Sequence, residues 1–174
     1  IDATTSEPNQ NSLQPIQVSQ TVFNPVATSE VALSANLPAT PLTGTATTAS
    51  PLTSNIDVYD ALGTVHSVAL SWVKSATGTW TVSIDAADST PTALGTATVK
   101  FGAASGNAVP EGTVGDISGA TGTVVGSTYA ANTAAVMSFD ATFGGVVQTI
   151  QLNLGNFGQT NGVTQYAGTG YALR

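Results

Sequence analysis

The sequence predicts an all-β fold, either an antiparallel β-sandwich or an irregular β-barrel, with long Gly/Thr-rich loops and little or no helix. Helical periodicity is hard to find, whereas short segments of alternating apolar and polar residues recur along the chain. The dipeptide Gly-Thr recurs at positions 44, 63, 78, 95, 112 and 122, each time near an expected turn. The 174 residues are 41% hydrophobic, which is enough to fill the core of one all-β domain.

The clearest element is a three-stranded meander over residues 53–86. Its first turn is predicted at residues 60–63, where Asp60 suits the first turn position and Gly63 suits a left-handed one. A second turn is predicted at residues 75–78, across which Trp72 and Trp80 can meet on one face. That face is predicted to carry His66, Val68, Leu70 and Trp72 on the second strand and Trp80, Val82 and Ile84 on the third.

Other strands are predicted with weaker signals. Gly144-Gly145 predicts the turn of a last hairpin, because two-residue hairpin turns favour residues that adopt positive φ. The glycine-rich stretch around Pro110 is expected to be loop, as is the Thr/Ala-rich segment between Pro38 and Pro51. The expected strands outside the meander are 14–18, 30–33, 97–101, 122–125, 134–143 and 146–154.

Charge is scarce in this chain. Only 7% of the residues are Asp, Glu, Lys or Arg, against roughly a quarter in an ordinary soluble domain. The three basic residues lie far apart and are outnumbered by ten acidic ones, for a net charge of −7. Because nucleic acids and anionic membranes bind clustered Lys and Arg, neither is expected as a partner. A surface of hydroxyls and small side chains suits a protein that stacks against copies of itself better than one that performs chemistry.

The chain has no cysteine, so it can form neither a disulfide nor a thiolate metal site. No run of 18 or more apolar residues could span a bilayer. The first residues lack the basic and apolar regions of a secretory signal. We therefore expect that a signal was removed, that the chain is a fragment, or that export uses another route.

The candidate catalytic and metal-binding residues are few. His66 is the one histidine, and catalysis would need an acid partner and a nucleophile brought to it by the fold, so a structural role is expected. Asp57 and Asp60 could be mistaken for part of a calcium site, but hard cations need six or more oxygens. We expect Asp60 to hydrogen-bond its own turn and Asp57 to face solvent. Asp85 and Asp88 repeat the same spacing, and sequence alone leaves a catalytic carboxylate pair open.

Two further patterns have a functional and a structural interpretation. The glycine-rich stretches 102–106 and 112–119 lack the Lys-Ser/Thr ending and the strand and helix neighbours of a phosphate-binding loop, so plain loops are expected. Trp72, Trp80, Tyr59 and Phe101 could stack on sugars, although aromatic residues at period two usually belong to a core. We expect no catalytic residue, no cofactor and no metal site.

The meander resembles the flagellar hook protein family, whose members carry a stretch of the form V-Y-D-S-L-G-N-x-H, then F/W-x-K, then a Trp after a short turn. Ala61 and Thr64 stand where the family has Ser and Asn. Residues 31–38 and 162–168 are similar to the family's sequence at the start and end of this domain. The positions that match the signature are Val58, Tyr59, Asp60, Leu62, Gly63, His66, Trp72, Lys74 and Trp80.

The resemblance implies a structural role and no enzymatic activity. It implies an outer fragment of the hook subunit, since the family's terminal heptad-bearing helices are absent from this sequence. The fragment would comprise a linker from the neighbouring domain (1–28), a β-barrel or sandwich domain (29–155) and a segment returning toward the neighbouring domain (156–174). The hook is the flexible universal joint that transmits motor torque to the filament. Its outer domains would make weak, sliding contacts between subunits.

The resemblance also implies partners and a location. The partners would be other copies of the subunit in a helical polymer, with rod and hook–filament junction proteins bound through parts outside this fragment. Export would use the flagellar type III channel without a cleaved signal peptide, leaving the domain extracellular. The isolated fragment is expected to be monomeric. Two alternatives remain open, namely an extracellular carbohydrate-binding or adhesive β-sandwich and another axial protein such as a distal-rod protein.

Overall fold

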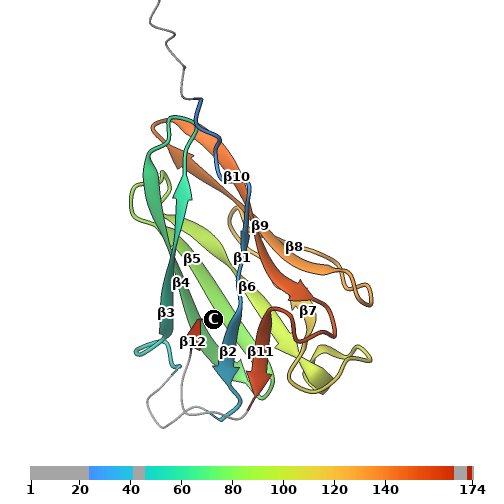
Figure 1. The fold of residues 1–174 in the computed structure, drawn as a ribbon. Helices are drawn as coiled ribbons and strands as arrows, with labels where there is room; N and C mark the ends of the chain where they lie inside the picture. Colours follow the sequence, from blue (N-terminus) through green and yellow to red (C-terminus); the bar gives the residue numbers. More distant parts are fainter. Residues whose placement is uncertain (1–23, 41–45, 167–171, 174) are drawn as a thin grey trace, which may run out of the picture.

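The computed structural model describes residues 24–40, 46–166 and 172–173. These residues form strands and one short 3₁₀ turn, η2 (Gly102–Ser105), and their strands lie mostly along one long axis (Figure 1). None of the described residues belongs to a helix long and apolar enough to cross a membrane. The strands are β1 (Glu30–Ala32), β2 (Ala35–Pro38), β3 (Leu52–Tyr59), β4 (Val65–Ala76), β5 (Thr79–Ala86), β6 (Ala93–Phe101), β7 (Val114–Ser118), β8 (Val125–Gly126), β9 (Ala134–Phe143), β10 (Val146–Asn156), β11 (Val163–Tyr166) and β12 (Ala172–Leu173).

The strands make three sheets around one hydrophobic core. A five-stranded antiparallel sheet has the order β3-β4-β5-β6-β7, a four-stranded sheet has the order β1-β10-β9-β8, and a three-stranded sheet has the order β11-β2-β12. The inward side chains of the two larger sheets belong to one buried cluster, which includes Trp72, Trp80, Met137, Phe139 and Leu152. The predicted all-β sandwich is therefore confirmed. The barrel alternative is not what forms, because the described strands end in open edges at β3 and β7.

The predicted meander is confirmed as β3, β4 and β5. Burial alternates along all three strands, and Trp72, Trp80 and Ile84 are fully buried on the inner face. Trp72 pairs with Val82 and Trp80 with Lys74, so the two tryptophans are diagonal neighbours across the β4–β5 hairpin. Period-two burial and turn chemistry are both local, which is why the sequence predicts this region well.

The last hairpin is also confirmed, as β9 and β10, and its turn residues Gly144 and Gly145 have φ of 57° and 84°. The strands predicted at 30–33 and 97–101 correspond to β1 and to the end of β6. The strand predicted at 122–125 is wrong, because residues 122–124 form a turn and only Val125–Gly126 pairs, as β8. The segment 14–18 lies outside the described residues.

The expectation of loop around Pro110 is partly wrong, because β7 (Val114–Ser118) lies within that glycine-rich stretch. It pairs antiparallel with β6 and places Val114 and Ile117 in the common core. Gly115 suits this strand because an added Cβ would lie 2.2 Å from Ser105 Oγ. A strand that contains Gly and Asp has little alternation, so the sequence pattern does not reveal it.

Two parallel strand pairs complete the sandwich, and the sequence did not predict them. β1 runs parallel to β10, and β2 runs parallel to β11. β1 and β2 are consecutive, as are β10 and β11. The segment β1–β2 therefore runs beside the segment β10–β11, first in the four-stranded sheet and then in the three-stranded one (Figure 1). The sandwich is thus mostly antiparallel, with two parallel pairs between distant parts of the chain.

Candidate functional site

Most signature positions gather at one end of the sandwich, which we call the head. The head consists of the β3–β4 turn (60–64), the β5–β6 loop (87–92) and the tip of the β9–β10 hairpin (142–147). Backbone and side-chain hydrogen bonds tie these pieces together across the two sheets. Thr90 N–H donates to the Thr142 carbonyl at 3.2 Å, Thr142 N–H donates to Ser89 Oγ at 2.9 Å, and Gln148 Nε2 donates to the Tyr59 carbonyl at 3.0 Å.

Asp60 holds the β3–β4 turn with one carboxylate oxygen. Its Oδ1 accepts hydrogen bonds from the N–H groups of Leu62 and Thr64, both at 2.8 Å, and Gly63 takes the left-handed conformation with φ of 81°. These are the bonds that the sequence predicted for this side chain. The hydrogen bond from Thr64 lowers the pKa of Asp60, burial opposes that shift, and His66 and the Leu62 N–H lower the pKa further. Oδ2 remains available for a second contact.

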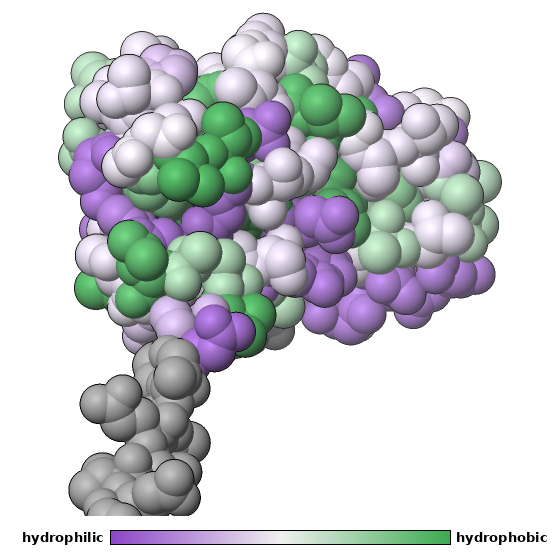
Figure 2. Space-filling model, turned by 90° about the horizontal axis from the view of Figure 1, so that it is seen from above, coloured by the Kyte–Doolittle hydropathy of each residue, from purple (hydrophilic) through white to green (hydrophobic). Residues whose placement is uncertain are grey.

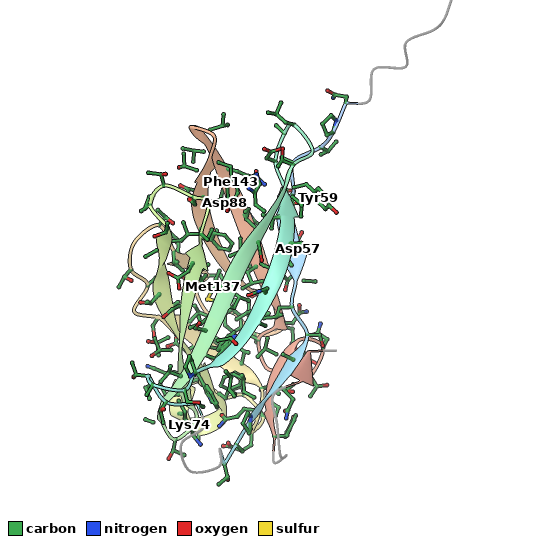
Figure 3. All side chains as sticks on the ribbon, turned by 90° about the vertical axis from the view of Figure 1, so that its left-hand side faces the viewer. Asp57, Tyr59, Lys74, Asp88, Met137 and Phe143 are labelled. Atoms are coloured by element: carbon green, nitrogen blue, oxygen red, sulfur yellow. The ribbon has the colours of Figure 1, made fainter. Side chains whose placement is uncertain are left out.

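His66 lies between two carboxylates. Its Nε2 is 3.2 Å from Asp60 Oδ2, and its Nδ1 contacts Asp88 Oδ2 from the β5–β6 loop. The imidazole also stacks on Phe143 of β9, with ring centroids 3.8 Å apart and planes 9° apart. Figure 3 shows Asp88 and Phe143 close together at the head. The side chain is 11% exposed. Through these contacts, one residue of β4 joins the β5–β6 loop of its own sheet to β9 of the other sheet.

The pKa of His66 is raised above its ordinary value. Burial alone lowers the pKa, because it penalises the imidazolium, but the hydrogen bonds and negative charges of Asp88 and Asp60 together outweigh that effect. The structure thus shows that His66 has acid partners, Asp60 and Asp88, which the sequence alone did not identify. It supplies no nucleophile, because within the described part of the chain both ring nitrogens contact carboxylates rather than a hydroxyl.

The other carboxylates do not assemble into a site. Asp57 is exposed on the outer face of β3, and Asp85 lies on the outer face of β5, so neither joins Asp60 or Asp88. In the described ranges, no group of three or more His, Cys, Asp or Glu is placed to hold a metal ion. The Asp88–His66 contact was missed from the sequence, although the matching spacing of the two Asp pairs was the one available signal.

The remaining signature residues divide between the head and the opposite end. Val58 is buried opposite His66, whereas Tyr59 and Leu62 are 52% and 86% exposed at the head. Lys74 lies at the other end, where its Nζ donates to the Ala39 carbonyl (Figure 3).

The expected alternatives for the aromatic residues now separate. Trp72, Trp80 and Phe101 are at most 2% exposed and belong to the core. Buried rings cannot stack on a glycan, so of the four aromatic candidates only Tyr59 offers an exposed ring. Three of the four rings that the carbohydrate-binding alternative could use are therefore excluded.

An apolar groove of about 280 Å³ lies across the head. Leu62, Val146 and Val147 on its walls are 86%, 65% and 62% exposed. Figure 2 looks down on the head and shows hydrophobic surface in several clusters between hydrophilic residues. The lining residues are Ala27, Asp60, Ala61, Leu62, Phe143, Gly144, Val146, Val147 and Gln148.

In this sandwich the ionisable cluster joins two connections of one sheet to each other and to the opposite sheet, which is the arrangement of a structural β-domain. The sequence matches the family model of the flagellar basal body protein FlaE D2 domain over residues 24–172, and the chain belongs to that family. The resemblance to the hook protein family is thereby confirmed. The chain is a structural domain of the flagellar hook type, and its location is the flagellum. The family is not a family of enzymes. No curated protein matches the sequence.

Proposed function

We propose that this chain is the outer part of a hook subunit, where it makes weak, sliding contacts with copies of itself while the hook bends as a universal joint. The observation that carries the proposal is the family match over 24–172, together with a composition in which only 7% of the residues are charged. In the same proposal, residues 1–28 lead into the β-domain from its neighbour, and residues 156–174, which include β11 and β12, lead back toward that neighbour. The subunit leaves the cell through the flagellar type III channel, and rod and junction proteins bind parts outside this chain.

The physical basis is the weakness of each surface contact. The outer faces of the sheets carry residues such as Thr53, Asn55, Ser67 and Gln151, which are exposed. Hydrogen bonds between such groups replace bonds to water at a net gain of only about 0.5–1.5 kcal/mol each. Among the described residues, Lys100 and Asp116 form the one Lys–carboxylate pair, at 3.5 Å. One register of neighbours can therefore replace another with little charge to desolvate.

The test is to add charge to the sliding surface. In the full-length subunit, Thr53→Lys with Ser67→Glu places opposite charges on the outer face of the five-stranded sheet, and Asn55→Lys with Gln151→Glu charges both sheets. Hooks that contain either pair should be straighter or stiffer by electron microscopy, and the cells should swim less well. Thr53→Ser with Ser67→Thr is the neutral control. Unchanged curvature and swimming in both charged variants would contradict the proposal.

Complementation separates a hook subunit from a distal-rod protein. The full-length gene should restore hooks in a strain that lacks its hook subunit and should not restore a strain that lacks the distal rod. The isolated chain should sediment as a monomer, because heterologous contacts of a helical polymer do not close in a dimer. A stable closed dimer in ultracentrifugation would count against this assembly.

A further inference from the structure

A further feature of the head is the set of contacts that His66 makes. The side chain is 11% exposed, yet both of its ring nitrogens contact carboxylates that come from two different connections, the β3–β4 turn and the β5–β6 loop. Its ring plane lies against Phe143 of the opposite sheet at 3.8 Å. No other residue that the structure describes makes polar contacts with two connections of one sheet and ring stacking with the other sheet at this end.

The protonation state of His66 decides how many of these contacts are favourable. A neutral imidazole has one N–H, so it can donate to one carboxylate while its other nitrogen presents a lone pair to the second. An imidazolium donates from both nitrogens and adds its positive charge between two negative ones. The complete set of contacts therefore requires the proton.

The surroundings leave Asp60 and Asp88 as the groups that control this proton. Each faces the ring from a connection packed against it, and described residues 142–148 of the hairpin tip contain no ionisable side chain. Asp57 and Asp85 lie on the outer face of the five-stranded sheet. Asp140 on β9 accepts a hydrogen bond from Thr149 Oγ1 at 2.6 Å. Lys74 and Lys100 lie at the opposite end of the domain.

We propose that His66 is a proton-controlled clamp, which in its imidazolium form locks the β3–β4 turn and the β5–β6 loop against the β9–β10 hairpin. Loss of the proton releases one of the two carboxylates, and Asp88 is the one that moves, because its side chain is 49% exposed whereas that of Asp60 is 18% exposed and is also held by Leu62 and Thr64. Asp60 and Phe143 line the apolar groove, so the state of the clamp sets the shape of the groove walls.

The pKa directions agree with this geometry. The pKa of His66 is raised, so the clamp closes at mildly acidic pH and opens as the pH rises through the folded-state pKa. The pKa of Asp60 is lowered, so its carboxylate stays ionised throughout that range. The clamp is a property of the domain alone and does not depend on its place in the hook.

NMR titration of the full 174-residue chain tests the proposal, because the chain has a single histidine. The ring protons of His66 should titrate above pH 6.5, the ordinary value for histidine. The methyl signals of Leu62, Val146 and Val147 should shift with the same midpoint, while those of Val114, in the core at the far end of β7, should not. A His66 midpoint at or below 6.5, or head methyls that do not follow it, would overturn the clamp.

Two matched variants assign the effect. Asp88→Asn should lower the midpoint of His66 and move the transition of the head methyls with it. Asp57→Asn removes the same charge from the outer face of β3, next to the strand of His66, and should leave both midpoints unchanged. His66→Phe keeps an aromatic ring against Phe143 and should abolish the transition. If Asp57→Asn shifts the midpoint as much as Asp88→Asn, a general charge effect replaces the clamp.

Discussion

The two ends of the sandwich are held together in different ways. At the head, side-chain contacts such as the stacking of His66 on Phe143 add to the backbone bond between Thr90 and Thr142, and three large apolar residues, Leu62, Val146 and Val147, are more than 60% exposed. The opposite end, which we call the foot, comprises the β4–β5 turn (76–79), residues 102–113 between β6 and β7, and residues 157–166 after β10. Here backbone bonds join residues 102–113 to β11. Gly102 N–H donates to the Thr113 carbonyl at 3.0 Å, and Gln165 N–H donates to the Gly112 carbonyl at 2.8 Å. Backbone bonds do not titrate, so these bonds of the foot do not depend on pH, whereas the contacts of His66 at the head involve a titratable group.

Glycines show the same contrast. At the head, Gly144 and Gly145 serve a turn with positive φ, and an added Cβ would meet no atom within 4 Å of either. At the foot, an added Cβ on Gly162 would lie 2.0 Å from the Leu154 carbonyl oxygen. Gly144 and Gly145 are therefore required for backbone conformation, and Gly162 is required for close packing.

The largest effect is expected for a tryptophan in the foot half. Trp80 is fully buried, so Trp80→Ala should lower the free energy of unfolding by about 3–5 kcal/mol in urea denaturation. Its Nε1 has no hydrogen-bond partner in the described part of the chain, so the loss is one of packing alone. Tyr59→Ala at the head is the matched control, because that ring is 52% exposed, and it should cost within about 0.5 kcal/mol. Equal losses would erase the distinction between the ends.

Paired glycine substitutions give the next largest effect. Gly162→Ala forces the backbone near Leu154 to move and should cost about 3 kcal/mol, at the upper end of the range for overpacking. Gly144→Ala has open space and should cost about 1–2 kcal/mol, the penalty of a left-handed conformation. Thermal unfolding of both variants ranks them directly. The reverse order would show that the hairpin turn, and not the foot, limits stability.

Features encoded by neighbouring residues were the ones that sequence could predict. The alternation through Ile56, Leu70 and Trp80 and the turn chemistry of Asp60 and Gly63 were read from the sequence, and the structure places them as expected. The resemblance to the hook protein family was based on these local motifs, and it is confirmed by the family model that matches residues 24–172.

Features that depend on distant residues could not be predicted. The carboxylate of Asp88 lies 22 residues beyond His66 in sequence, and Phe143 comes from the other sheet. The parallel pairs β1–β10 and β2–β11 likewise join segments that no local pattern relates. The sequence suggested that the lone histidine belonged to an apolar face, and the repeated spacing of the two Asp pairs did not show that two acids would contact both of its nitrogens.

The pH dependence of stability gives a smaller effect that belongs to the head. The pKa of His66 is raised in the folded state, so its contribution is fully present below about pH 6.5 and is lost as the pH rises through the folded-state pKa. The pKa of Asp60 is lowered, so its contribution is present above the ordinary value of 3.8 and is lost in acid. Urea midpoints measured from pH 5 to 9 should fall across the upper range for the parent chain and not for His66→Phe. A parallel fall in both would assign the pH dependence to other groups.

The smallest effect is expected from the apolar groove itself. Leu62 and Val147 are 86% and 62% exposed, so Leu62→Ser and Val147→Ser should change the free energy of unfolding by no more than about 0.5 kcal/mol. Val163→Ser at the foot is the control, because Val163 is 1% exposed, and a buried hydroxyl without a partner should cost about 1–3 kcal/mol beyond the lost packing. Urea denaturation measures all three variants. A large loss for Leu62→Ser would mean that the groove is part of the core, whereas a negligible one leaves its apolar walls without a role in stability, as the contrast between head and foot requires.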